Sequence, residues 1–90
     1  MKDNLESAII ITGASSGLGR GIAQFLSTKG RPIVLVGRNI DRLMETKENC
    51  LTNGLKAEYC HVIAVDITKL EAAETVVTQT VKKYGSIGAL

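Results

Sequence analysis

The chain reads AIIITGASSGLGRG over residues 8–21, an apolar run that leads directly into a cluster of glycines and serines. A β-branched run without polar interruption is typical of a strand that is buried on both faces. Gly13, Gly17 and Gly19 follow, and a segment of helical periodicity begins beside them. Free N–H groups at a helix start attract phosphate, and glycines leave the backbone open to it. The stretch therefore predicts a strand, a phosphate-binding turn and a helix.

The spacing of the glycines separates this turn from other phosphate-binding loops. It is Gly-x-x-x-Gly-x-Gly rather than Gly-x-Gly-x-x-Gly, and no Gly-Lys-Ser/Thr follows, so it is not a P-loop. We expect Gly13 and Gly17 to allow close approach, Gly19 to let the helix pack tightly, and Ser15 and Ser16 to add hydroxyl donors. The alternative is a glycine-rich turn that binds nothing.

Two further apolar runs, at residues 33–36 and 62–65, resemble the first. Helical patterns occupy about residues 17–29, 40–53 and 69–84. Strands that alternate with helices imply right-handed crossovers and a parallel sheet. We therefore expect one α/β unit of Rossmann type over residues 1–90, with three strands in the order 3-2-1.

The ends and faces of the helical segments can also be predicted. Asn39 is expected to cap the second segment, and Thr68 and Glu71 form a capping box for the third. The large apolar residues of the first segment share one face: Leu18, Ile22, Phe25 and Leu26.

Charge and hydropathy narrow the function classes. The chain has 11 Lys and Arg against 9 Asp and Glu, a net charge of +2, unlike the basic surface of a nucleic-acid-binding protein. Apolar residues make up 44%, as in ordinary globular domains, and no run approaches the roughly 18 residues of a membrane span. We expect neither nucleic-acid binding nor a membrane span.

The cysteines and the single histidine suggest no special chemistry. Cys50 and Cys60 do not make a disulfide framework, and with His61 they make a poor zinc site, so no metal is expected. The first residues lack the features of a secretory signal, and we expect a cytoplasmic chain.

The motif Thr12-Gly13-x-x-x-Gly17-x-Gly19 resembles the cofactor motif of the short-chain dehydrogenase/reductase family. Members of that family have a doubly wound Rossmann-type fold and use NAD or NADP to oxidise alcohols or reduce ketones. The resemblance covers nearly all of this chain but only the amino-terminal part of the family's domain. It implies that these residues bind a dinucleotide: Gly13, Ser15, Ser16, Gly17, Leu18 and Gly19.

The end of the second strand indicates which dinucleotide binds. An NAD site carries an acidic residue there, roughly 20 residues beyond the glycines. Gly37 and Arg38 occupy that place, and a guanidinium pairs well with a 2′-phosphate. The pair resembles the family's NADP-preferring pattern, with Asn39 as a further contact, although Ser16 stands where many such members have a basic residue. We expect NADP; the alternatives are a solvated arginine and an NAD-specific member.

Asp66 follows the third strand, at the edge where the carboxyl ends of parallel strands face a ligand. The resemblance implies that Asp66 contacts the adenine amino group and that the backbone of Ile67 lies near the ring. The alternative is a loop aspartate that favours the dipole of the third helix.

The catalytic residues of the family have no counterpart in the sequence. Members use a serine and a Tyr-x-x-x-Lys pair, but Ile63 and Gly88 stand four residues after Tyr59 and Tyr84. We therefore assign no catalytic residue and interpret both tyrosines as structural. The chain ends within an apolar segment that resembles the approach to a fourth strand. We expect an incomplete sheet, with three strands plus the start of a fourth, and the first strand as an edge.

Two hypotheses from different classes follow. The first is the NADP-binding segment of an oxidoreductase, inactive alone, whose carbonyl or alcohol substrate binds only in a complete chain. The second is a non-catalytic nucleotide-binding or dimerising module, and a homo-oligomer stays open. A cooperative melt that NADP shifts upward favours the module, and an aggregated chain favours the fragment.

Overall fold

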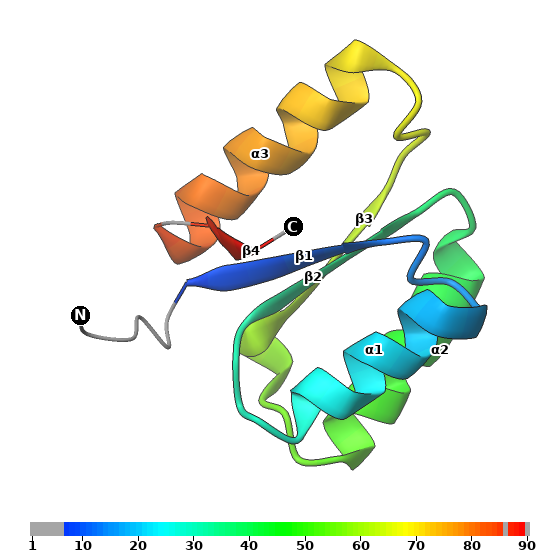
Figure 1. Cartoon of the computed structure of the whole chain (residues 1–90), viewed down its shortest axis with the longest axis vertical. Helices are drawn as coiled ribbons and strands as arrows, with labels where there is room; N and C mark the ends of the chain where they lie inside the picture. Colours follow the sequence, from blue (N-terminus) through cyan, green and yellow to red (C-terminus); the bar gives the residue numbers. More distant parts are fainter. Residues whose placement is uncertain (1–6, 86, 90) are drawn as a thin grey trace.

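The chain folds into a parallel sheet with helices on both sides, as a computed structural model describes for residues 7–85 and 87–89. Residues 1–6, on which the secretory-signal expectation rests, lie outside these ranges. The sheet has the strand order β3-β2-β1-β4, and α1 and α2 lie on one side of it and α3 on the other (Figure 1). The elements are β1 (Ala8–Thr12), α1 (Gly17–Ser27), β2 (Ile33–Gly37), α2 (Ile40–Thr52), the 3-10 helix η1 (Ala57–Tyr59), β3 (Cys60–Ala64), α3 (Leu70–Tyr84) and β4 (Ile87–Ala89).

The central strand β2 is buried on both faces, which explains its unbroken apolar run. Ile33 and Leu35 pack with residues of α1 and α2, whereas Val34 and Val36 pack with Val76 of α3. All four β2 side chains are completely buried, because successive residues of a strand point to opposite faces and each face carries helices. Burying each of them contributes about 1.5–3 kcal/mol. The Rossmann-type α/β fold expected from the sequence is confirmed.

The expectation that β1 forms an edge of the sheet is wrong. β4 pairs with β1 in parallel, with Ala8 opposite Ile87 and Ile9 opposite Ala89. Pairing of this kind needs only backbone N–H and C=O groups, so a strand of three residues is long enough to cover the beginning of β1. β1 therefore lies between β2 and β4.

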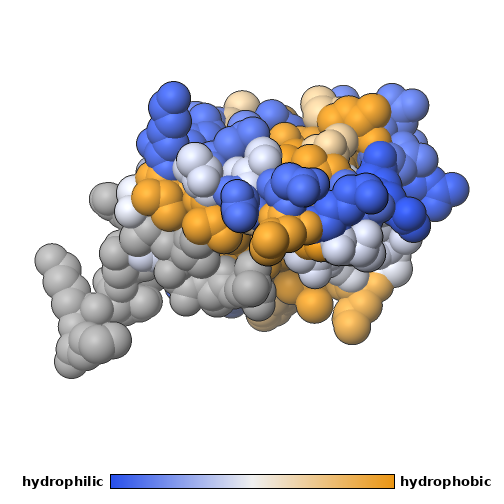
Figure 2. Space-filling model, turned by 90° about the horizontal axis from the view of Figure 1, so that it is seen from above, coloured by the Kyte–Doolittle hydropathy of each residue, from blue (hydrophilic) through white to orange (hydrophobic). Residues whose placement is uncertain are grey.

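Helix α1 contacts the sheet through different side chains from the large apolar residues of its sequence pattern. α1 buries Ala23 and Ser27, while Leu18 and Phe25 are 80% and 62% exposed. Hydrophobic side chains consequently reach the surface among hydrophilic ones (Figure 2). Within the described ranges, no helix is both long enough and apolar enough to cross a membrane.

The helix caps agree with the sequence at one site and differ at another. The side chain of Asn39 caps α2 by accepting a hydrogen bond from the N–H of Arg42 at 3.1 Å, as expected. The capping box before α3 is absent: the N-cap is Lys69, which makes no side-chain cap bond. Thr68 instead donates twice to the carboxylate of Asp66, because an aspartate two residues earlier offers a closer acceptor in a turn.

Candidate functional site

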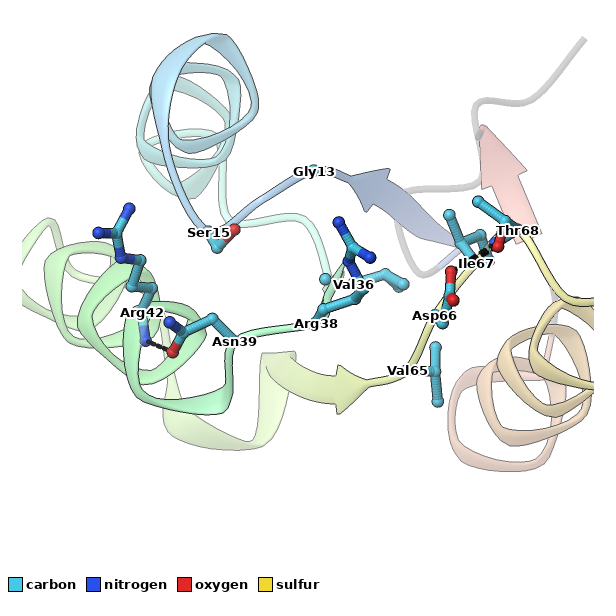
Figure 3. Close-up of a pocket in the computed structure, with 11 residues that line it drawn as sticks. Gly13, Ser15, Val36, Arg38, Asn39, Arg42, Val65, Asp66, Ile67 and Thr68 are labelled. Carbon is cyan, nitrogen blue, oxygen red and sulfur yellow. Dashed lines mark hydrogen bonds between the residues drawn. The ribbon is translucent and has the colours of Figure 1, made fainter.

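The carboxyl ends of β1, β2 and β3 lie at one edge of the sheet. Their register pairs Thr12 with Val36 and Gly37 with Ala64, so the segments that follow the three strands meet there. They surround a pocket of about 440 Å³ (Figure 3). Residues predicted from the sequence that line this pocket are Gly13, Ser15, Arg38, Asn39, Asp66 and Ile67.

Other predicted residues lie outside the pocket lining, at the start of α1. They are Ser16, Gly17, Leu18 and Gly19. The lining also includes Arg42 and Thr68, neither of which the sequence indicates as a cofactor-binding residue. Arg42 lies in the first turn of α2, three residues after the N-cap Asn39 that accepts from its N–H, and its place beside a predicted cap is the signal that could have indicated it.

The glycines of the first turn are required by the backbone itself. Gly13 and Gly17 have φ of 65° and 60°, in the left-handed region that other residues rarely adopt. Gly19 packs against the turn: a Cβ built there would collide with the carbonyl oxygen of Gly13 and lie 2.7 Å from the carbonyl carbon. The turn is fixed to β2 by the N–H of Ala14, which donates to the carbonyl of Val36 at 3.1 Å.

The start of α1 is free to bind an anion. Its N-cap residue, Ser16, makes no side-chain cap hydrogen bond, and the first turn contains no acidic residue. The N–H groups of Ser15 and Ser16 have no acceptor among residues 7–85 and 87–89. Unpaired N–H groups and the positive end of the helix dipole suit a phosphate, so this backbone fits the phosphates of a dinucleotide.

Arg38 lies between the glycine-rich turn and Asp66 (Figure 3). Its side chain is exposed and makes no hydrogen bond or ion pair with another residue of the described ranges. The preceding Gly37 is crowded, since a Cβ there would lie 3.2 Å from Cδ2 of Leu43. A guanidinium that is not hydrogen-bonded within these ranges thus stands where a carboxylate would repel a phosphate.

Asp66 is held as a carboxylate by Thr68. Oδ1 of Asp66 accepts from the Thr68 hydroxyl at 2.6 Å and from the Thr68 N–H at 3.1 Å. These bonds lower the pKa of Asp66 below its ordinary value of 3.8, and the positive charge of Arg38 adds to the effect. The hydrogen bonds use one oxygen, so the other carboxylate oxygen is left as an acceptor.

Replacing Thr68 with valine is expected to raise the pKa of Asp66 toward 3.8, because the hydroxyl bond is the largest cause of the shift. Since the folded pKa is the lower one, Asp66 stabilises the fold above its unfolded pKa and loses this contribution as the pH falls through the folded value. The Thr68→Val variant brings the folded pKa of Asp66 closer to the unfolded pKa, so this carboxylate contributes less to stability above both values. A carboxyl-carbon NMR titration measures the pKa, and an unchanged value in Thr68→Val would contradict the assignment.

Tyr84 and the two cysteines are engaged in packing. The Tyr84 hydroxyl donates to the carbonyl of Glu58 at 3.0 Å, and burial raises the pKa of Tyr84 to about 12. Cys50 and Cys60 are buried thiols. Across the part of the chain that is described, no group of three or more His, Cys, Asp or Glu could hold a metal ion.

The strand order 3-2-1-4 and a glycine-rich turn at the carboxyl end of the first strand define a Rossmann-type nucleotide-binding protein. Residues 7–90 match the family model described as short chain dehydrogenase. The chain belongs to the short-chain dehydrogenase/reductase family.

Individual relatives agree with this assignment. The chain is 35% identical over 85 residues to an uncharacterized oxidoreductase of Staphylococcus saprophyticus, covering 94% of this chain and 36% of the relative. The apo-form of glucose dehydrogenase from Caenorhabditis elegans matches with a TM-score of 0.87 and 29% identity, over 91% of this chain and 35% of that one. A metagenomic short-chain oxidoreductase in complex with NADP matches with a TM-score of 0.86 and 25% identity, over 94% and 37%. The chain spans about a third of the length of these proteins.

Proposed function

We propose that this chain binds NADP(H), as the cofactor-binding part of an oxidoreductase that transfers a hydride between NADP and an alcohol or ketone. The observation that carries the proposal is Arg38, which follows β2, lines the pocket, is exposed and has no hydrogen-bond or ion-pair partner among the described residues. Gly37 precedes it, so the position that holds ribose hydroxyls in NAD sites has no carboxylate. The NADP-bound relative supports the same cofactor class.

Each predicted residue has a role in this proposal. The N–H groups of Ser15, Ser16 and the first turn of α1, from Gly17 through Leu18, bind the pyrophosphate, while Gly13 and Gly19 shape the turn. Arg38 and Asn39 bind the 2′-phosphate, and the guanidinium of Arg42 adds positive charge at the same pocket. Asp66 accepts from the adenine amino group, and the N–H of Ile67 lies near the ring.

The hydride transfer is proposed for a whole protein of which residues 1–90 form the cofactor-binding unit. When bound, NADPH supplies the hydride. This chain contributes binding and orientation, because neither Tyr59 nor Tyr84 has a lysine four residues on. The proton donor and the substrate pocket are not assigned to residues of this chain.

Titration calorimetry of the chain with NADP and with NAD tests the proposal. NADP is expected to bind about 10- to 100-fold more tightly, since a charged hydrogen bond to the 2′-phosphate contributes roughly 1.5–3 kcal/mol. Equal affinities, or tighter binding of NAD, would refute the preference for NADP. If neither dinucleotide bound, the proposed cofactor site itself would be refuted.

A further inference from the structure

Arg20 of α1 and Thr46 of α2 hold two consecutive carbonyl groups of the glycine-rich turn. The hydroxyl of Thr46 donates to the carbonyl oxygen of Ala14 at 2.8 Å. Nη2 of Arg20 donates to the carbonyl oxygen of Ser15 at 2.8 Å. Nε of Arg20 donates to Oγ1 of Thr46 at 2.9 Å, which joins the two side chains. Neither residue lines the pocket, and the proposed cofactor contacts do not use them.

Burial makes this arrangement well defined. Thr46 and Ala14 are completely buried. The Thr46 hydroxyl accepts from Arg20, and its one proton has two acceptors, the Ala14 carbonyl at 2.8 Å and the Arg42 carbonyl at 3.2 Å, of which the Ala14 carbonyl is the nearer. Arg20 is fixed further by the carbonyl of Arg42 at 3.0 Å and the carboxylate of Glu45 at 3.3 Å. Hydrogen bonds in a buried setting are stronger than in water, and a buried group that loses its partner is destabilising.

The direction of these carbonyls determines the direction of the N–H groups that follow them. In a trans peptide the C=O and the next N–H point in opposite directions, and the described backbone contains no cis peptide. Holding the Ala14 carbonyl at Thr46 turns the N–H of Ser15 away from α2. Holding the Ser15 carbonyl at Arg20 likewise turns the N–H of Ser16 away from the guanidinium of Arg20. These are the N–H groups that lack an acceptor within the described ranges.

We infer that Arg20 and Thr46 are positioning residues for the phosphates of the dinucleotide. They keep two partly negative carbonyls away from the phosphate and present two N–H groups to it before the ligand binds. Without them the turn must be ordered on binding, which lowers the affinity. The inference rests on the proposed function, because it assigns how the same turn is prepared for its ligand.

The test compares two ligands with the Thr46→Val variant by titration calorimetry. NADP contacts the turn through its pyrophosphate, whereas adenosine 2′-monophosphate has no pyrophosphate and depends on Arg38 and Asp66. Valine has nearly the same shape as threonine but cannot hydrogen-bond. We expect the NADP affinity to fall about five- to tenfold, as for the loss of one or two hydrogen bonds. The affinity for adenosine 2′-monophosphate is expected to stay within about twofold of wild type.

Thr80→Val is the matched control. Thr80 is also completely buried, but its hydroxyl has no hydrogen-bond partner among the described residues, and it lies on α3, on the other side of the sheet. This variant should bind both ligands like wild type. Thr46→Ser keeps the hydroxyl and is expected to restore most of the NADP affinity.

The outcomes separate the inference from the proposal beneath it. Equal losses for both ligands in Thr46→Val, or no loss for either, would overturn the positioning role while leaving NADP binding intact. If Thr46→Val does not fold, Arg20→Lys replaces it. Lysine keeps the charge but lacks the rigid fork through which Nε reaches Thr46 and Nη2 reaches the Ser15 carbonyl. NADP affinity equal to wild type in Arg20→Lys would overturn the inference. A wild-type chain that binds neither ligand would refute the proposed function and the inference together.

Discussion

Gly19→Ala is expected to lower the affinity of the chain for NADP by about 10- to 100-fold, because an extra methyl in a packed contact typically costs about 1–3 kcal/mol. The new Cβ would collide with the Gly13 carbonyl and lie 3.2 Å from the Cα of Ala14. These atoms belong to the backbone of the turn and cannot rotate away as a side chain would. The turn must move, and the N–H groups that face the phosphate move with it.

The same substitution also tests how packing and helix propensity compete. Alanine in a helix interior is favoured over glycine by roughly 0.5–1 kcal/mol, whereas forcing an extra methyl into a packed contact costs typically 1–3 kcal/mol. Gly19→Ala should therefore destabilise the chain in urea unfolding. Gly21→Ala is the matched control on α1, because nothing lies within 4 Å of its Cβ position. Gly21→Ala should be more stable than wild type and bind NADP with unchanged affinity. If Gly19→Ala proved more stable than Gly21→Ala, the packing argument would be contradicted.

Arg38→Asp is expected to lower the NADP affinity by on the order of 100-fold, with the NAD affinity unchanged or raised. The variant removes the guanidinium proposed to bind the 2′-phosphate, places a carboxylate against that phosphate, and offers an acceptor to the ribose hydroxyls of NAD. Titration calorimetry with both dinucleotides measures the ratio of the NADP affinity to the NAD affinity in the variant and in wild type.

Lys82→Asp supplies the control for the change in net charge. Lys82 is exposed in the last turn of α3. The pocket residues 65–68 come just before the first turn of the same helix, so Lys82 lies at its opposite end. This variant should leave the ratio of the NADP and NAD affinities unchanged. NADP binding that survives Arg38→Asp, or a ratio that moves equally in Lys82→Asp, would show that Arg38 does not select the cofactor.

Local patterns in the sequence were sufficient to predict the elements and part of the pocket. The apolar runs predicted the strands because helices lie on both sides of the sheet and bury most of these side chains. Asn39 was recognisable as a cap because its side chain acts three residues away. Arg38 could be selected because the end of β2 is a fixed distance along the chain from the glycines. The capping box at Thr68 was mispredicted since Asp66 competes for the same hydroxyl.

Contacts between distant segments could not be predicted in this way. The pairing of β4 with β1 joins residues about 80 positions apart, and no local pattern encodes which strand lies beside which. Likewise the face of α1 that meets the sheet carries Ala23 and Ser27, although the largest apolar residues of that helix suggest another face.

The sequence is enough to conclude that this chain alternates strands and helices, that its first turn needs glycine, and that Gly37 and Arg38 stand at the end of the second strand in place of an acidic residue. Backbone sterics and spacing along one segment suffice for those conclusions. Only the tertiary structure decided that Arg20 and Thr46, which are 26 positions apart, meet at the carbonyls of Ala14 and Ser15. The physical reason is that these hydrogen bonds join α1 and α2 through the packing of both helices on β2, so they exist only once the sheet has formed.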